Sequence, residues 1–266
     1  MFPNPEILGI PLEWYSLWQW TAILTTICFG LWYYVYRLAE KIVLPKLGIL
    51  ILSFLVIGYL GARTFSILFE FTETGNWLEL SVIWQNIGDG RLRWYGALLF
   101  LLLFLPLTAK LFRIKKLTPF LDAMALNLCL FNAIVKQACL FSGDGCYGIY
   151  TNSVFGMYFP YGYAPNILPV HPTPLYDSLF HFLFFVGLVW WNKRKFFNGQ
   201  TAIAFFSGTA IFNIMLEFIR SNPELAMGLN LSQFTYILIL LVTISYYLII
   251  AKKQEKETIG ITQIDI

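Results

Sequence analysis

The chain has 266 residues, of which 58% are hydrophobic and 12% are charged, and its formal net charge is +3. Soluble domains carry about 25% charged residues, so this composition excludes a soluble globular protein and indicates an integral membrane protein. The small basic excess lies in short loops, so it reports membrane topology and not a nucleic-acid-binding surface.

Seven apolar runs are long enough to cross a hydrocarbon layer of roughly 30 Å, which takes about 20 helical residues. They cover about residues 17–36, 47–70, 94–112, 120–141, 174–191, 201–219 and 232–251. The sequence therefore predicts an all-α polytopic membrane protein with seven transmembrane helices. We expect residues 1–253 to form a single transmembrane domain and residues 254–266 to form a polar cytoplasmic tail.

The basic residues between these runs predict the orientation, because loops rich in Lys and Arg stay in the cytoplasm. Most of them lie around residues 37–46, 110–116, 193–195 and 252–256, whereas the other side holds Arg91, Arg93 and Arg220. We therefore expect the N terminus outside, the C terminus in the cytoplasm, and external loops at 71–93 and 142–173. The first residues, MFPNPEILGIPLEW, have no positively charged leader, so no cleavable signal peptide is predicted.

The longer external loop begins with SGDGCYG, Ser142 to Gly148, and continues with many aromatic residues. Glycines at 143, 145 and 148 allow backbone N–H groups to face inward in a tight turn, and such turns bind phosphate-like anions. Because Lys136, Arg63 and Arg220 are all expected near the outer leaflet, the combination predicts a site for a lipid phosphate. The alternative is that the aromatic residues form a belt that anchors the protein at the membrane interface.

Several ionisable side chains fall within or at the ends of the predicted helices, where they are costly and by default functional candidates. They are Arg63, Asp122, Lys136, Asp177, His181 and Glu217. Asp177 and His181 are four residues apart, so they can touch on one helix face. Asn213, Glu217 and Arg220 likewise share a face. The alternative interpretation, favoured for Asp122 and His181, is that these residues are polar clamps between helices.

Two further residue types bear on chemistry. His171, in HPTPLYD beside the external site, can act as an acid or a base because its unperturbed pKa is near neutrality. The cysteines at 28, 129, 139 and 146 are scattered with no CxxC spacing, so we expect no metal site. A disulfide between Cys139 and Cys146 on the oxidising side stays open as an alternative.

These motifs together resemble the prolipoprotein diacylglyceryl transferase family. The segments that carry the resemblance follow the family's order: Trp14–Tyr15, GAR at Gly61–Arg63, DGRLRWYGALL at Asp89–Leu99, FLDAMA around Asp122, KQACLFSGDGCYG at Lys136–Gly148, HPTPLYD at His171–Asp177 and EFIRSNPE at Glu217–Glu224. The resemblance implies a multi-pass enzyme of the bacterial inner membrane. Its expected reaction moves diacylglyceryl from phosphatidylglycerol to the cysteine thiol of a lipoprotein precursor in lipoprotein biosynthesis, without a cofactor.

The resemblance also implies roles for single residues. The expected catalytic residues are Tyr95, Lys136 and His171. The expected substrate-binding residues are Tyr15, Arg63, Asp144, Gly148, Tyr176, Asp177, Glu217 and Arg220. The expected partners are the phospholipid substrate, the precursor peptide and membrane lipid.

The chain departs from the family pattern at two places. It has Val135–Lys136 where the family has glycine-arginine, and it has Asn213 where the family has a second arginine. Lysine keeps the charge but lacks the planar fork that contacts two phosphate oxygens, and asparagine keeps neither. These departures motivate two alternatives. One is a catalytically degenerate lipid-binding or accessory membrane protein of the same fold, and the other is a transferase with another acceptor or lipid head group.

Overall fold

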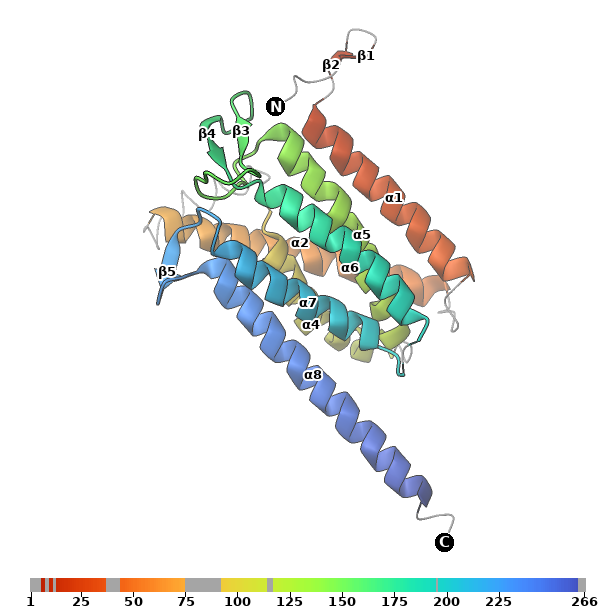
Figure 1. Cartoon of the computed structure of the whole chain (residues 1–266). Coiled ribbons are helices and arrows are strands. Elements are labelled where there is room, and N and C mark those ends of the chain that lie inside the picture. The colour runs from red at the N-terminus through yellow and green to blue at the C-terminus, as the bar shows by residue number, and fades with distance from the viewer. Residues whose placement is uncertain are drawn as a thin grey trace. The chain divides into compact units, whose positions relative to one another are not determined.

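A computed structural model describes residues 6–7, 10–11, 13–36, 44–74, 92–113, 117–194 and 196–262. The described residues form seven helices and three antiparallel hairpins (Figure 1). The helices are α1 (Trp14–Tyr36), α2 (Leu44–Thr74), α4 (Trp94–Leu111), α5 (Leu117–Ser142), α6 (Thr173–Asn192), α7 (Gln200–Glu217) and α8 (Leu231–Thr262). The hairpins pair β1 (Glu6–Ile7) with β2 (Ile10–Pro11), β3 (Met157–Phe159) with β4 (Asn166–Val170), and β5 (Glu224–Ala226) with β6 (Leu229–Asn230).

Each apolar run in the sequence coincides with one of these helices, so the prediction of a helical protein is confirmed. Five of them, α2, α4, α5, α6 and α8, contain stretches long and apolar enough to cross a membrane. Helices α1 and α7 fall outside this set, since α1 is rich in Trp and Tyr and α7 contains several polar residues. The crossing of all seven helices, the sides of the two termini and the single domain stay predictions.

Three boundaries differ from the sequence expectations. Helix α1 begins at Trp14, so the Trp14–Tyr15 motif forms its first turn and does not precede it. Helix α2 extends to Thr74 and so takes the first residues of the predicted loop 71–93, whose residues 75–91 lie outside the described part. Helix α8 continues to Thr262, so most of the predicted tail is helical.

Contacts along the chain divide it into two compact units, which are described separately. The first comprises Met1–Ile42, Lys116–Phe205 and Phe212–Asn230. Within it, α5 packs against both α1 and α6 (Figure 1). Polar residues of α5 and α6 are buried, among them Asn132 and His181, whereas Leu179 and Leu183 are exposed. A helix with its polar groups inside and its apolar groups outside is suited to lipid surroundings.

The start of α7 is fixed by a carboxylate from α5. Asp122 is fully buried and accepts hydrogen bonds from the backbone N–H groups of Gly199, at 2.9 Å, and Ala202, at 3.0 Å. The first N–H groups of a helix have no partner within the helix, and a carboxylate there also interacts favourably with the helix dipole. Asp122 therefore has the structural role that the clamp interpretation predicts for it.

The loop after α5 is held over the end of that helix by aromatic packing. The Tyr147 ring stacks on Phe159 of β3, with 4.9 Å between ring centroids. Burial raises the pKa of the Tyr147 phenol, helped by the charge of Asp144, so the phenol stays protonated and donates to the Ala164 carbonyl. Backbone N–H groups of Tyr163 and Ala164 donate to the carbonyls of Ser142 and Gly143. Tyr147 and Phe159 therefore pack inside the folded loop, whereas most of its other aromatic side chains are exposed, so the interfacial belt stays a prediction for these: Tyr150, Phe155, Tyr158, Tyr161 and Tyr163.

The second unit comprises Val43–Lys115, Phe206–Ile211 and Leu231–Ile266. Its helices α2 and α4 are in close contact at a pair of glycines. A Cβ on Gly61 would lie 2.4 Å from the Gly96 carbonyl oxygen, and a Cβ on Gly96 would lie 2.4 Å from the Gly61 carbonyl oxygen. Small residues allow two helices to approach this closely. Helix α8 packs on α4, and the Tyr246 hydroxyl of α8 donates to the Leu102 carbonyl of α4 at 3.3 Å.

Candidate active site

Four charged side chains of the first unit form an ion-pair cluster: Lys136 of α5, Asp177 of α6, Glu217 of α7 and Arg220 just after α7. Lys136 Nζ lies 2.9 Å from Asp177 Oδ2, and Arg220 Nη2 lies 3.2 Å from the same oxygen. Arg220 Nη1 also lies 2.6 Å from Glu217 Oε1. Three helices are therefore linked through two cations and two carboxylates.

The carboxylates of the ion-pair cluster are its innermost groups. The side chains of Asp177 and Glu217 are each 1% exposed, whereas those of Lys136 and Arg220 are each 14% exposed. Buried carboxylates must be paired to be tolerated. The two cations consequently lie between the buried acids and the surface of the unit, where an anion arriving from outside would meet them first.

A histidine and three asparagine side chains complete the pairing of both carboxylates. Asp177 Oδ1 lies 2.9 Å from His181 Nδ1 and accepts from Asn132 Nδ2 at 3.4 Å. Glu217 Oε2 accepts from the side-chain amides of Asn222, at 2.6 Å, and Asn230, at 3.0 Å. The predicted contact between Asp177 and His181 is thus confirmed, and His181 is a fully buried neighbour of the cluster.

The glycine-rich turn follows directly on the end of α5, and its first residue, Ser142, lies six residues after Lys136. Gly143 and Gly145 adopt positive φ angles of 60° and 89°, which glycine accepts without strain. The Asp144 carboxylate accepts from the Cys146 backbone N–H at 3.1 Å and so closes the turn. The thiol of Cys139 donates to Cys146 and lowers the pKa of the Cys146 thiol.

Gly148 joins the turn to the segment that carries Arg220. Its backbone N–H donates to the His171 carbonyl at 2.8 Å, and Gly148 forms a β-bridge with Arg220. A Cβ at this position would lie 2.2 Å from the Ile219 carbonyl oxygen, so the approach requires glycine. Gly148 therefore acts as a spacer that brings two backbone segments together.

The remaining predicted residues of this unit, Tyr15, His171 and Tyr176, are not members of the ion-pair cluster. His171 Nδ1 lies 3.3 Å from the Tyr176 hydroxyl, and both side chains are half-buried. Tyr15, at the start of α1, is close enough to Asp144 and Lys136 to interact with them electrostatically. Among the described residues, the His171 side chain is placed beside Tyr176 and not within the ion-pair cluster.

Two predicted residues, Arg63 and Tyr95, belong to the second unit. Both are buried, and both lie next to the glycines of the helix crossing: Arg63 follows Gly61 on α2 by two residues, and Tyr95 immediately precedes Gly96 on α4. The Tyr95 ring contacts Phe65 and Tyr236 edge to face. Because the units are described separately, these two residues are not placed relative to Lys136.

Some residues of the site were missed by the sequence analysis. Asn132 lies one helical turn before Lys136 on α5, and an amide inside an apolar run was a usable signal. Asn222 lies within the EFIRSNPE segment but was not singled out there, and Asn230, in β6 of the last hairpin, gave no signal. The disulfide alternative anticipated that Cys139 and Cys146 lie close together; both are free cysteines, and the sequence did not predict that Asp144 joins them, with possible ligand atoms of all three within 4.8 Å of one another.

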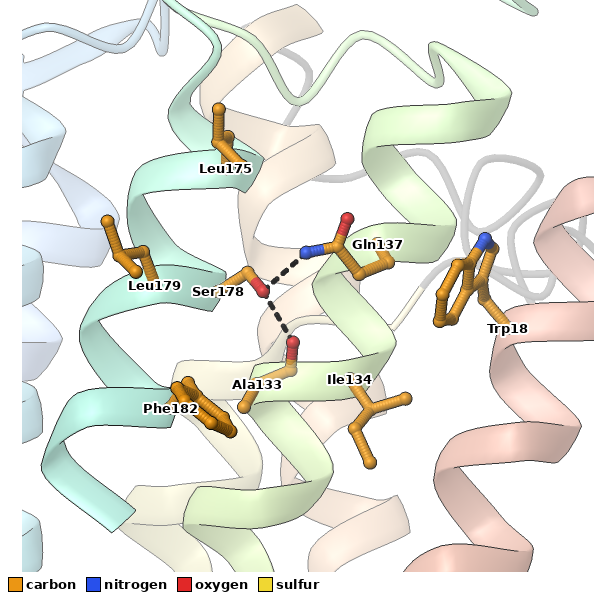
Figure 2. Close-up of a pocket in the computed structure, with 8 residues that line it drawn as sticks. All are labelled: Trp18, Ala133, Ile134, Gln137, Leu175, Ser178, Leu179 and Phe182. Carbon is orange, nitrogen blue, oxygen red and sulfur yellow. Dashed lines mark hydrogen bonds between the residues drawn. The ribbon is translucent and has the colours of Figure 1, made fainter. Parts of the chain in front are cut away.

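A pocket of about 280 Å³ lies among α1, α5 and α6 (Figure 2). Its lining is mostly apolar and consists of Trp18, Ala133, Ile134, Gln137, Leu175, Ser178, Leu179 and Phe182. Gln137 donates to Ser178 Oγ at 2.6 Å, and Ser178 donates to the Ala133 carbonyl at 2.6 Å, as Figure 2 shows. Gln137 and Ser178 directly follow Lys136 and Asp177 in the sequence, so lining residues of the pocket and residues of the ion-pair cluster are chain neighbours on α5 and α6.

Comparison with known proteins identifies the family. The model of the prolipoprotein diacylglyceryl transferase family matches residues 5–249, which is most of the chain. This chain belongs to that family. The sequence resemblance is therefore confirmed at the level of the family.

Individual relatives carry the same name, phosphatidylglycerol–prolipoprotein diacylglyceryl transferase. The protein from Leptospira interrogans is 36% identical over 53% of this chain and 45% of its own length. A second form from Clostridium perfringens is 33% identical over 52% of this chain and 54% of its own length. The match with these relatives thus spans about half of their length. The Thermotoga petrophila protein is 28% identical over 94% of this chain and 85% of its own length.

Proposed function

We propose that this protein transfers the diacylglyceryl group of phosphatidylglycerol to the cysteine thiol of a lipoprotein precursor. Family membership and the names of the relatives support this activity. The observation that carries the proposal is the pair of cations, Lys136 and Arg220, that meet on one oxygen of Asp177 beside the glycine-rich turn.

The reaction sets clear physical requirements. A thiolate sulfur forms a bond to the glycerol carbon, the bond from that carbon to the phosphate oxygen breaks, and glycerol phosphate leaves with the electron pair. The thiol must first lose its proton to become the nucleophile. Charge that develops on the leaving phosphate must be met by cations or backbone donors.

Lys136 and Arg220 fit the second requirement. Both contact Asp177 Oδ2, at 2.9 and 3.2 Å, so they are close enough together to contact one phosphate group. We expect the lipid phosphate to compete with Asp177 for these cations. Asp177 stays held by His181 and Asn132 through its other oxygen, which keeps the buried carboxylate paired during the exchange.

The other expected residues have supporting roles in this proposal. The family resemblance assigns the thiol proton to Tyr95 or His171 and a phosphate contact to Arg63, and the proposal keeps these roles as expectations. Tyr15, Asp144, Tyr176 and Glu217 shape the site around the substrates, and Gly148 keeps the turn close to Arg220. The proposal needs neither a cofactor nor nucleic acid.

The pocket beside the cluster supports a lipid substrate. An apolar lining suits an acyl chain, and about 280 Å³ is near the lower end of ligand pockets, enough for part of one chain. The hydrogen-bonded pair of Gln137 and Ser178 lies where the chain would join the polar head. The acyl chain would thus lie among α1, α5 and α6 while its phosphate meets Lys136.

We place the protein in the bacterial inner membrane as a multi-pass protein. Five helices with membrane-spanning character and the family support this location. The distribution of Lys and Arg supports seven crossings with the N terminus outside and the C terminus in the cytoplasm. The glycine-rich turn would then face the side where lipoprotein precursors emerge.

One observation favours a second candidate, a lipid-binding or accessory protein without turnover. The ion-pair cluster contains two cations and two carboxylates, so its formal charge is balanced before any phosphate arrives. Lys136 and Asn213 also stand where the family has arginine, and Asn213 is buried. A transferase with a different acceptor would share these features.

The test uses the full-length protein in detergent with phosphatidylglycerol and a peptide that carries a lipobox cysteine. Mass spectrometry of the peptide should detect a gain of one diacylglyceryl group, and the gain should require both the lipid and the cysteine. Phospholipid that co-purifies with the protein while the peptide gains no mass would contradict the transferase proposal and favour the second candidate. A gain on a different small thiol, but not on the peptide, would assign another acceptor.

A further inference from the structure

Two thiols and a carboxylate gather at the end of α5, outside the ion-pair cluster. Cys139 lies in the last turn of α5, and Asp144 and Cys146 lie in the glycine-rich turn that follows. One possible ligand atom from each residue lies within 4.8 Å of the other two, and all three residues are half-buried. In the described part of the chain, no other group of His, Cys, Asp or Glu residues has this geometry.

The spacing of these atoms suits a small metal ion. Tetrahedral zinc takes sulfur ligands at about 2.3 Å and carboxylate oxygen at about 2.0–2.2 Å, which places ligand atoms about 3.5–3.8 Å apart. The three possible ligand atoms lie within 4.8 Å of one another, so zinc binding would have to draw them together by about 1 Å at most. Asp144 Oδ1 accepts the Cys146 backbone N–H, so the other oxygen can face the metal while this hydrogen bond orients the carboxylate.

The surrounding charges permit a divalent cation. Zinc binding would release the protons of the two thiols, and the resulting two thiolates and one carboxylate supply three negative charges. The nearby cations are compensated, since Lys136 pairs with Asp177 and Arg220 pairs with both Asp177 and Glu217. A bound dication would therefore meet three anionic ligands and no unpaired cation among the groups of the ion-pair cluster.

The two sulfur atoms and the carboxylate oxygen favour one metal ion over others. Thiolates favour Zn²⁺ and Cu⁺ over Mg²⁺ and Ca²⁺, and a carboxylate as third ligand favours Zn²⁺ over Cu⁺. We propose that Cys139, Asp144 and Cys146 bind one zinc ion, which ties the glycine-rich turn to the end of α5 and leaves a fourth coordination position open. The CxxC rule misses this site because its two cysteines are seven residues apart across a helix end.

The experiment measures metal binding by the full-length protein in detergent after removal of bound metal with a chelator. Zinc content after equilibration with Zn²⁺ and gel filtration should reach one ion per chain. With Co²⁺ as the probe, the sulfur ligands should give a ligand-to-metal charge-transfer band. Cys139→Ser and Cys146→Ser should each abolish the band, and Asp144→Asn should weaken affinity by about tenfold or more.

Cys28→Ser is the matched control, because Cys28 is also a free cysteine but lies on α1, outside the cluster. It should bind zinc like the parent protein. Zinc should also raise the Tm of the parent and of Cys28→Ser, but not the Tm of the two other serine variants. This second readout separates lost binding from misfolding, since a misfolded variant shows no cooperative unfolding without zinc.

Three outcomes would overturn the proposal. The first is a zinc content below about a tenth of an ion per chain in the parent protein, and the second is a cobalt band that remains in both Cys139→Ser and Cys146→Ser. The third is a parent protein whose mass is lower by two hydrogens and which binds no zinc. The last would mean that an oxidant had taken two electrons from the thiols to form a disulfide. None of these readouts involves a lipid or a peptide, so their failure is distinct from failure of the proposed transferase activity.

Discussion

Asp177 contacts Lys136 and Arg220 through one oxygen and His181 through the other, at 2.9 to 3.2 Å. The contact with His181 could be predicted from the sequence, because the two residues are four apart on one helix. The contacts with Lys136 and Arg220 could not, since they join residues about forty positions apart on different helices. Spacing along a chain predicts neighbours within a helix, but pairing between helices depends on how the helices pack.

Replacing Asp177 by Asn should destabilise the protein, because Lys136 and Arg220 would lose a shared anionic partner in a buried place. Breaking a buried ion pair by removing one partner costs about 3–5 kcal/mol. Thermal unfolding in detergent, followed by circular dichroism, should therefore give a clearly lower Tm. Glu224→Gln, at an exposed acid of β5, is the control and should leave the Tm unchanged. Equal Tm values for both variants would show that the ion-pair cluster does not hold the fold.

Asp122 should matter for stability and not for chemistry. Asp122→Ala removes the acceptor of two backbone N–H groups at the start of α7, and hydrogen bonds to a charged group are each worth about 1.5–3 kcal/mol. We expect a lower Tm for this variant. Its transferase activity, divided by the amount of folded protein, should equal that of the parent. A fall in activity at an unchanged Tm would instead place Asp122 in the reaction.

The helices themselves are the part of the fold that the sequence predicts best. Every apolar run became a helix, because an apolar run in lipid must satisfy its backbone internally. The helix ends lie within a few residues of the expected ones except at α8, which continues through most of the predicted tail to Thr262. The close contact between α2 and α4 was less predictable. Gly61 and Gly96 appear in the sequence as parts of two motifs, and nothing in either motif indicates that the two glycines meet.

Gly61→Ala should separate α2 from α4 or strain their contact, because the new Cβ would lie 2.4 Å from the Gly96 carbonyl oxygen. Overpacking of this kind costs about 1–3 kcal/mol. Gly48→Ala is a matched control on the same helix, since a Cβ there meets nothing within 4 Å. In thermal unfolding, Gly61→Ala should lower the Tm and Gly48→Ala should leave it unchanged or raise it. The reverse order would contradict the helix crossing.

The orientation of the whole molecule rests on the basic residues of its loops. It predicts that the loop of residues 142–173 is external and that the loop around residues 193–199 is cytoplasmic. Val154 and Phe196 are suitable reporters, being 93% and 92% exposed. In intact cells, a membrane-impermeant maleimide should label Val154→Cys directly and Phe196→Cys only after permeabilisation, with the parent protein as background. Labelling of Phe196→Cys in intact cells would place this loop outside and so contradict the predicted topology.

At this scale the sequence predicts more of the fold than of the reaction. Family membership follows from motifs distributed along most of the chain, and the structure places six of the predicted residues within or beside one cluster: Lys136, Asp144, Gly148, Asp177, Glu217 and Arg220. What the motifs do not reveal is the balance of charge. Only the packing of α5, α6 and α7 shows that the cations expected to hold a phosphate are already paired with acids.

In the proposed reaction, Lys136 holds the lipid phosphate while diacylglyceryl is transferred to a thiol. Initial rates of diacylglyceryl gain on the lipobox peptide, measured by mass spectrometry, test it with Lys136→Ala, Lys136→Arg and the exposed control Lys110→Ala. Loss of a group that stabilises the leaving anion should lower the rate of Lys136→Ala by about 10²–10³-fold. Lys136→Arg should retain activity, because it keeps the charge and adds the planar fork, and Lys110→Ala should match the parent. A Lys136→Ala rate within about twofold of the parent rate would show that Lys136 does not hold the lipid phosphate in the reaction.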